Sequence, residues 1–213
     1  MEKKFTFLKD QFLALLILTI VIAGCTKYRN VPSKYGTFTP PPAGTIAFGS
    51  LRINECILKG SDPGAVTLIG GNAKWFELFN PTTSDISLTS GLWYVTDDLT
   101  SKTKCAVTQG TTSTQYLTVP AGGYLIIACP SSGSSSTTPS PTRFNCNFSL
   151  SSTSGDIGIF YQTSSSSPLV AVDTLKYNFT AISGKSYGRK PDGNDPFYFS
   201  SFLTAVTPEA SNQ

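Results

Sequence analysis

Two glutamates stand in apolar stretches that are typical of buried strands: Glu55 in "LRINECIL" and Glu77 in "KWFELFN". Glycosidases use such a pair of carboxyl groups, about 5 to 10 Å apart in an open cleft. Apolar neighbours would raise a carboxyl pKa and favour a general acid. The alternative is that both groups accept hydrogen bonds inside the frame of the domain, because structural networks also perturb carboxyl groups. Burial of both side chains would exclude the hydrolase.

The chain contains no histidine. This removes the usual general base, the common activator of nucleophiles and the commonest zinc ligand. Ser-His-Asp hydrolases, Cys-His proteases and HExxH metalloproteases are therefore excluded. The sequence also lacks a P-loop and a G-x-G-x-x-G motif. We accordingly expect no catalytic residue, no metal and no cofactor.

Oxygen-rich and basic stretches are the next candidates for a binding site. Asp97-Asp98 and "PDGND" (Pro191 to Asp195) could meet a calcium ion, but neither has the spacing of an EF-hand, and such steps are ordinary in turns. "GKSYGRK" (Gly184 to Lys190) could contact a phosphate. A solvated hairpin face is the prediction for this stretch, because nucleic-acid surfaces carry more charge.

Aromatic side chains could offer a platform for a sugar ring or a partner protein. The candidates are Trp93, Tyr94, Tyr187, Phe197 and Tyr198. An exposed Trp or Tyr in a groove would favour a glycan-binding function, whereas burial would assign these rings to the core of the domain.

The N-terminus predicts a secretory signal. Lysines precede an apolar run from Phe12 to Ala23, which is shorter than the roughly 20 residues of a membrane-spanning helix. The ending Ile22-Ala23-Gly24-Cys25 resembles the bacterial lipobox, in which a peptidase cuts before a cysteine that carries a diacylglyceryl group. We predict a signal peptide over residues 1–24 and a lipid at Cys25 that anchors the protein in the membrane.

The mature chain is expected to begin with an extended tether over residues 25–49, because "TKYRNVPSKYGTFTPPPAGT" is rich in turn-forming residues and proline. Thr26 stands where an aspartate retains many Gram-negative lipoproteins in the inner membrane. This favours the outer membrane, with the domain facing the periplasm or the exterior. Removal of the signal lowers the formal charge from +3 to +2, so we expect no nucleic-acid partner.

Four cysteines remain besides the lipidated one: Cys56, Cys105, Cys129 and Cys146. An exported domain with four cysteines can form two disulfides, in three possible connectivities. None of them belongs to a C-x-x-C pair, which disfavours zinc. The alternative is four buried thiols.

Short apolar runs separated by loops rich in Ser, Thr, Pro and Gly must position all these residues. Runs such as "GLWYVTDD", "GGYLIIAC", "GDIGIFYQ" and "LVAVDTLKYN" have no helical period and are typical of a β-sandwich. Period-2 alternation would place Leu51, Ile53 and Glu55 on one face of a strand, and Trp75, Glu77 and Phe79 on one face of another. The longest loop, Ser131 to Thr142, is expected to be a disordered excursion, with glycosylation as an alternative.

Several fragments together resemble the lamin-tail domain. "LRINEC" is similar to its "INE" opening, and "WFELFNPTTSDISLTSGLWYVTDD" to its central motif. "LTVPAGGYLIIA", "NFSLSSTSGDIGIFYQ", "VAVDTLKYN", "SYGRKPDG" and the terminal "TPEASN" follow in the family's order. The resemblance covers about Ser50 to Gln213. Leu92 between Gly91 and Trp93, and the insertion Ser131 to Thr142, depart from the family's pattern.

The resemblance implies an immunoglobulin-like antiparallel β-sandwich over residues 50–213 that is not itself catalytic. It also implies a frame role for Glu55 and Glu77, and a structural "R-x-P-D-G" turn containing Arg189 and Asp192. Asp173, in "VAVDTLKYN", is a further candidate structural carboxylate. The expected function is a lipid-anchored interaction module with a protein or glycan ligand. The alternatives are a carbohydrate-binding component of a surface glycan system and a hydrolase that uses Glu55 and Glu77.

Overall fold

The computed structural model describes residues 39–42, 44–59, 74–88, 92–107, 117–129, 143–198 and 206–212. The predicted signal peptide, the lipidation site Cys25, most of the predicted tether and the loop Ser131 to Thr142 lie outside these residues. Within the described part of the chain, no helix is long and apolar enough to cross a membrane.

The predicted all-β fold is confirmed, because every regular element in the described ranges is a strand. Most of these strands coincide with the short apolar runs of the sequence. The strands are β1 (Arg52–Ile57), β2 (Lys74–Phe79), β3 (Ile86–Ser87), β4 (Leu92–Thr96), β5 (Cys105–Ala106), β6 (Thr118–Val119), β7 (Tyr124–Cys129), β8 (Arg143–Asn145), β9 (Ser154–Gln162), β10 (Val170–Asn178), β11 (Tyr187–Arg189) and β12 (Phe197–Tyr198).

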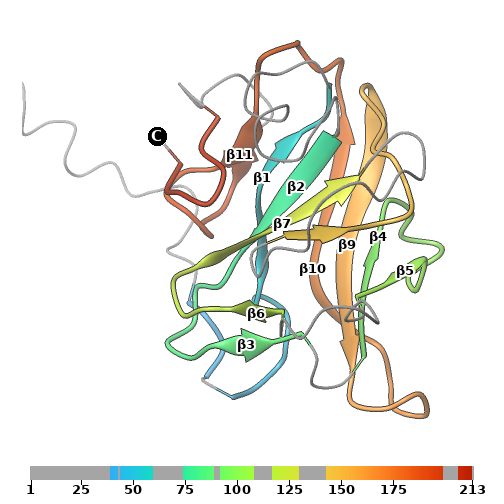
Figure 1. The fold of residues 1–213 in the computed structure, drawn as a ribbon, viewed down its shortest axis with the longest axis vertical. Coiled ribbons are helices and arrows are strands. Elements are labelled where there is room, and N and C mark those ends of the chain that lie inside the picture. Colours follow the sequence, from blue (N-terminus) through green and yellow to red (C-terminus); the bar gives the residue numbers. More distant parts are fainter. Residues whose placement is uncertain are drawn as a thin grey trace, which may run out of the picture. The chain divides into compact units, whose positions relative to one another are not determined.

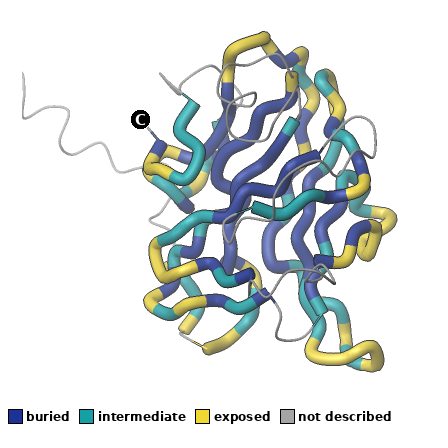
Figure 2. The backbone as a smooth tube through the Cα atoms, in the orientation of Figure 1, coloured by how far each residue is buried: buried dark blue, intermediate teal, exposed yellow. Residues whose placement is uncertain are grey.

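Two larger sheets form a sandwich. One has the strand order β12-β11-β1-β2-β7-β8 and the other β10-β9-β4-β5, and β3 pairs with β6 in a small ribbon (Figure 1). All pairs are antiparallel except β7 with β8, which is parallel. Figure 2 shows that buried residues follow the strands, whereas exposed ones gather at the turns. Residues such as Ile53, Trp93, Ile127 and Ile159 form the main core.

A β-bulge in β1 corrects one expectation about its faces. Ile53 pairs with Leu78 and Glu55 pairs with Glu77, so Asn54 is an extra residue between them. A bulge of this kind inverts the alternation beyond it. Ile53 therefore points into the main core, whereas Glu55 lies on the opposite face of the sheet. The predicted alternation of β2 holds, since Phe76 and Leu78 pack in the main core and Trp75 packs in a second cluster.

The basic stretch before the C-terminus also differs from its prediction. Tyr187 and Arg189 lie on β11 and are buried, while Lys185 and Lys190 beside them are exposed. β11 is covered because it pairs with β1 on one side and with β12 on the other. The stretch is therefore an internal strand with charged ends and not a solvated hairpin face.

The last residues of the predicted tether belong to the folded part of the chain. The amide of Gly49 donates to the carbonyl oxygen of Val172 at 2.7 Å, and Ser50 Oγ donates to the carbonyl oxygen of Thr45 at 2.9 Å. Val172 is the extra residue of a second bulge, in β10, and its carbonyl is therefore available to this segment. The contacts attach residues 45–50 to the edge of the four-stranded sheet.

Candidate functional site

Glu55 and Glu77 face each other across neighbouring strands on the outer side of the six-stranded sheet. They form a direct cross-strand pair, and both side chains have no exposed surface. Opposed residues in an antiparallel pair have Cβ atoms about 4.5 to 5.5 Å apart. Ile57, Trp75 and Ile126 lie on the same face as a small apolar cluster. The two carboxyl groups thus share an environment that is closed to water.

The C-terminal segment, residues 206–212, lies over this pair. The amide of Glu209 donates to Glu77 Oε2 at 2.6 Å, and the amide of Thr207 donates to Glu55 Oε1 at 3.2 Å. Thr207 Oγ1 adds a bond to Glu55 Oε2 at 3.2 Å. In Figure 1 this segment, coloured deep red, ends beside β11. The two glutamates therefore hold the end of the chain by its backbone.

A third carboxylate, Asp192, completes the cluster from the turn after β11. It accepts hydrogen bonds from Asn54 Nδ2 at 2.9 Å, from the amide of Asn212 at 3.0 Å and from the hydroxyl of Tyr124 at 2.8 Å. Asn54 Nδ2 also donates to Glu77 Oε1 at 3.2 Å. The bulge places the Asn54 side-chain amide between Glu77 and Asp192, because the extra residue of a bulge is left out of the regular strand pairing.

The turn that carries Asp192 is closed by Gly193. Its amide donates to Asn54 Oδ1 at 2.9 Å, and its φ of 69° is a conformation that favours glycine. A Cβ atom there would lie 3.0 Å from the ring of Phe79. The "PDG" sequence thus forms a turn that fits against β1 and β2, as its turn chemistry predicts.

Burial dominates the electrostatics of the pair. It raises the pKa of Glu55 to about 7 and the pKa of Glu77 to about 9. Hydrogen bonds from Thr207 and from the Glu209 amide lower these pKa values only in part, while the neighbouring Asp192 raises both. Desolvation penalises the charged form of a carboxyl group, and a second carboxylate beside it adds repulsion. Glu77 is accordingly protonated at neutral pH.

Asp173 belongs to a separate cluster of buried charges beside the start of β1. Its Oδ2 lies 3.3 Å from Arg52 Nε and 3.4 Å from Arg189 Nη2, and it accepts a hydrogen bond from the amide of Ile53 at 2.8 Å. Asp195, half-exposed, pairs with both arginines. Arg189 also donates from Nε to the carbonyl oxygen of Ile53 at 2.9 Å. Burial raises the pKa of Asp173, and the two arginines oppose this rise.

The C-terminal segment links the two clusters. Asn212 Nδ2 donates to the carbonyl oxygens of Asn54 at 3.2 Å and of Arg189 at 2.6 Å, and Thr207 Oγ1 donates to Asn212 Oδ1 at 2.8 Å. One short segment thereby connects β1, β2 and β11. Its contribution is structural cross-linking of strands that are remote in sequence.

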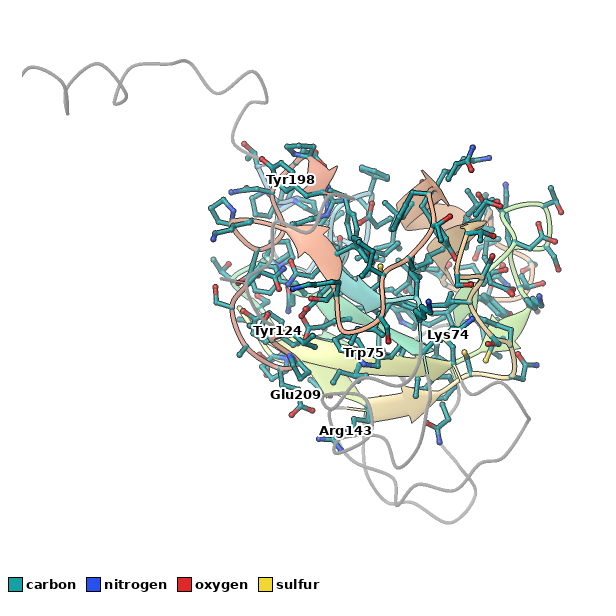
Figure 3. All side chains as sticks on the ribbon, turned by 90° about the horizontal axis from the view of Figure 1, so that it is seen from above. Lys74, Trp75, Tyr124, Arg143, Tyr198 and Glu209 are labelled. Atoms are coloured by element: carbon teal, nitrogen blue, oxygen red, sulfur yellow. The ribbon has the colours of Figure 1, made fainter. Side chains whose placement is uncertain are left out.

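Glu209 gives a direct test of this backbone contact. Its φ of 60° lies in the left-handed region, and its side chain pairs with Arg143 at 3.3 Å (Figure 3). We expect Glu209→Gly to change the free energy of unfolding by less than about 1 kcal/mol, since relief of the φ strain offsets a half-exposed ion pair. Glu209→Pro should cost about 2 to 3 kcal/mol, because proline lacks the N–H and requires a negative φ. Urea unfolding measures both changes, and equal losses would contradict a role for the amide.

The other oxygen-rich stretches are turns with internal partners. Asp97 pairs with Lys104 at 2.5 Å, and Asp98 Oδ1 accepts from the amide of Thr100 at 2.9 Å. The hydrogen bonds to the side chain of Thr100 and to its amide lower the pKa of Asp98. A shallow hollow includes Asp97, Asp98 and Asp156 together with Lys176. Among the described residues, no group of three or more His, Cys, Asp or Glu side chains is arranged to hold a metal ion.

Most of the candidate aromatic residues belong to the interior. Trp93, Tyr187 and Phe197 are buried in the main core, and Tyr94 and Tyr198 are half-buried. Trp75, the second tryptophan of the chain, is also fully buried. Tyr187 has a structural use, since its hydroxyl accepts a hydrogen bond from the amide of Ile182 at 2.8 Å.

All four predicted disulfide cysteines are buried, and the structure has them as free thiols. Cys129 ends β7 and Cys146 follows β8, with their Sγ atoms 3.0 Å apart. Cys105 opens β5 and Cys56 lies on β1.

The structure thus brings Glu55, Glu77 and Asp192 together and places Asp173 in a second cluster. Sequence reasoning missed three polar partners, namely Asn54, Thr207 and Asn212, and it also missed Arg52. The sequence did contain a clue to these residues, because both "INE" and the terminal "TPEASN" belong to the resemblance. The polar residues of these two fragments are hydrogen-bonded to one another in the structure.

A scan of the chain against protein-family models finds no match, and a search among curated proteins also finds none. The resemblance to the lamin-tail family therefore rests on the residues quoted above.

Proposed function

We propose that this protein is a non-catalytic interaction module, a lamin-tail-like sandwich held on the bacterial outer membrane by a lipid at Cys25. The observation that supports a non-catalytic role is the state of the two glutamates. Both are fully buried, and their oxygens accept hydrogen bonds from the chain's own C-terminal segment. A glycosidase needs its two carboxyl groups on either side of a sugar in an open cleft.

The arrangement of the quoted fragments supports the family part of the proposal. "LRINEC", "WFELFN", "SYGRKPDG" and "TPEASN" supply most members of the first polar cluster and both arginines of the second, and "VAVDTLKYN" supplies Asp173. Fragments that are far apart in the chain therefore cooperate in one internal network. Such a network favours one arrangement of the strands, because each buried polar group is satisfied only when its partners are in place.

The glycan-binding alternative finds little support in the described residues. It called for an exposed Trp or Tyr in a groove, whereas both tryptophans and Tyr187 are buried and Tyr94 and Tyr198 are half-buried. We therefore favour a protein ligand in the cell envelope, recognised by the outer surface of the sandwich.

The anchor is tested by labelling cells that express the full-length chain with a palmitate analogue. We expect the wild type to incorporate the label and to partition into the detergent phase, and Cys25→Ser to lose both properties, because the serine hydroxyl is not a substrate for thioether lipidation. Label retained in Cys25→Ser would contradict the anchor.

The non-catalytic role is tested with the same preparations. Wild type and Glu55→Gln are compared on a panel of chromogenic glycosides, and the two are expected to give the same background rate. Turnover in the wild type that disappears in Glu55→Gln would establish a hydrolase instead.

The class of ligand is tested by chemical cross-linking in intact cells, which should give a discrete adduct between this protein and one envelope protein. If no such adduct forms and the wild-type protein binds to a glycan array, the carbohydrate-binding alternative would be favoured.

A further inference from the structure

Three of the four buried cysteines lie near one another where the two sheets meet. All four belong to the main hydrophobic core, and Cys129 interacts electrostatically with both Cys105 and Cys146. The Sγ atoms of Cys129 and Cys146 are 3.0 Å apart, and neither side chain is open to solvent. Two thiols at this distance are in contact. The sulfur atoms of a disulfide are about 2.05 Å apart, so small rotations of the two side chains would bring these sulfur atoms to bonding distance.

The strand register holds this pair in place. Ile127 pairs with Phe144 and Ala128 with Asn145, so Cys129 and Cys146 are the next neighbours along the parallel ladder. The amide of Cys146 donates to the carbonyl oxygen of Ala128 at 2.9 Å, which extends the pairing to this point. Neighbouring strands are about 4.8 Å apart, within the range of Cα separations that disulfides span. We propose that Cys129 and Cys146 form a disulfide, and that Cys56 and Cys105 stay as thiols.

The other two cysteines are less well placed for a bond. Cys56 pairs with Phe76 on β2, and Phe76 pairs with Ile127 on β7, so a whole strand separates Cys56 from the Cys129 strand. Cys105 lies on the opposite sheet, and its Sγ is directed to the carbonyl oxygen of Ala106 at 3.9 Å. The geometry therefore selects one connectivity and one disulfide, in place of the two disulfides that the even count allowed.

The oxidation is a thiol–disulfide exchange with a donor disulfide, carried by a small molecule or by an oxidoreductase of the cell envelope. One cysteine attacks the donor as a thiolate, which forms a mixed disulfide and releases one donor thiol. The second cysteine then attacks the mixed disulfide, which forms the Cys129–Cys146 bond and releases the other donor thiol. The protein loses two electrons and two protons, and the donor gains them.

Because both sulfur atoms are buried in the folded protein, we expect this oxidation to take place during folding. The thiolate is the attacking form, and burial raises the pKa of the Cys129 thiol well above its usual range. The folded protein should therefore exchange slowly in both directions. Oxidation belongs to the folding stage, before the two sheets close over the sulfur atoms, and the finished bond should resist reductants as long as the domain stays folded.

The bond would secure an edge of the six-stranded sheet. β8 is a short, half-buried edge strand, and the connection from Pro130 to Thr142 precedes it. A disulfide at Cys129 and Cys146 closes this connection into a loop and holds β8 against β7. Loop closure restricts the unfolded chain, so we expect the oxidised protein to melt several degrees above the reduced one, of the order of 5 to 10 °C.

The test is disulfide mapping of the full-length chain after refolding in a mixture of reduced and oxidised glutathione. The protein is alkylated in denaturant without reduction and digested with trypsin and then chymotrypsin. Both proteases are needed because Cys105 and Cys129 share one tryptic peptide, which chymotrypsin divides at Tyr116 and Tyr124. We expect a peptide pair linked through Cys129 and Cys146, with Cys56 and Cys105 alkylated. A link that includes Cys56 or Cys105, or alkylation of all four, would overturn the proposal.

Two matched variants keep the proposal testable by a second route. Cys105→Ala should retain the linked pair and the difference in melting between oxidised and reduced protein. Cys146→Ala should lose both, and Cys129 should then be alkylated. In the folded wild type, a phosphine reductant should leave the bond intact until denaturant is added. Rapid reduction of the folded protein would contradict a buried Cys129–Cys146 bond.

Discussion

Raising the pH from about 5.5 to about 8.5 is expected to lower the thermal midpoint of the full-length chain by about 10 °C. The cause is the buried acid pair. In the unfolded chain both glutamates have the ordinary pKa of 4.5, whereas in the folded protein their pKa values are about 7 and about 9. Between these limits the folded state binds more protons than the unfolded state, so stability falls as the pH rises.

The size of the effect follows from the number of protons involved. Each retained proton contributes about 1.4 kcal/mol per pH unit. The contribution of Glu55 is fully present below pH 4.5 and is lost as the pH rises through about 7, and that of Glu77 is lost as it rises through about 9. A midpoint that stays constant over this range would show that the pair is not desolvated.

Glu77→Gln isolates the acid pair from other titrating groups. Glutamine carries no charge at any pH, so the variant should lose less than half as much stability as the wild type between about pH 5.5 and 8.5. At the acid end we expect a loss of about 1 to 2 kcal/mol, because one of the donors Asn54 and Glu209 then meets an amide NH2 group. At the alkaline end the variant should be the more stable protein. Parallel pH profiles would contradict a raised pKa at Glu77.

Arg189→Met should be the most destabilising of the single substitutions considered, at about 3 to 5 kcal/mol, or a fall in thermal midpoint of about 10 °C or more. Arg189 is buried, and its guanidinium holds Asp173, Asp195 and the carbonyl oxygen of Ile53. Methionine fills the space but leaves these acceptors with fewer donors. Removing one partner of a buried ion pair is costly because the other charge stays in the interior.

The matched control is Arg143→Met, which makes the same chemical change at a half-exposed site. Arg143 pairs with Glu209 at 3.3 Å, and exposed pairs of this kind contribute about 0 to 1 kcal/mol. Urea unfolding of both variants at one pH gives the comparison. If Arg189→Met costs no more than Arg143→Met, the buried network can be replaced by apolar packing and is not needed for stability.

The sequence alone determined the class of fold and the residues worth examining. Alternation along a strand is a property of two or three neighbouring residues, so the faces of β2 and the succession of strands could be predicted from local patterns. The absence of histidine also excluded whole classes of enzyme without any structure. Glu55 and Glu77 could be singled out because charged residues are rare among apolar neighbours, whereas Asp173 and Asp192 were singled out within fragments that resemble the lamin-tail domain.

Only the tertiary structure decided how these residues are used. The bulge at Asn54 moved Glu55 to the other face of the sheet, and no local pattern marks that extra residue. Glu77 receives its hydrogen bond from Glu209, and Asp173 meets Arg52 and Arg189 across different strands. The register that brings Cys129 beside Cys146 is likewise a product of pairing between strands. Contacts of this kind depend on how segments remote in sequence pack together. A hydrophobic pattern of period two shows which face of a strand is buried, but it contains no information about which remote segment packs against that face.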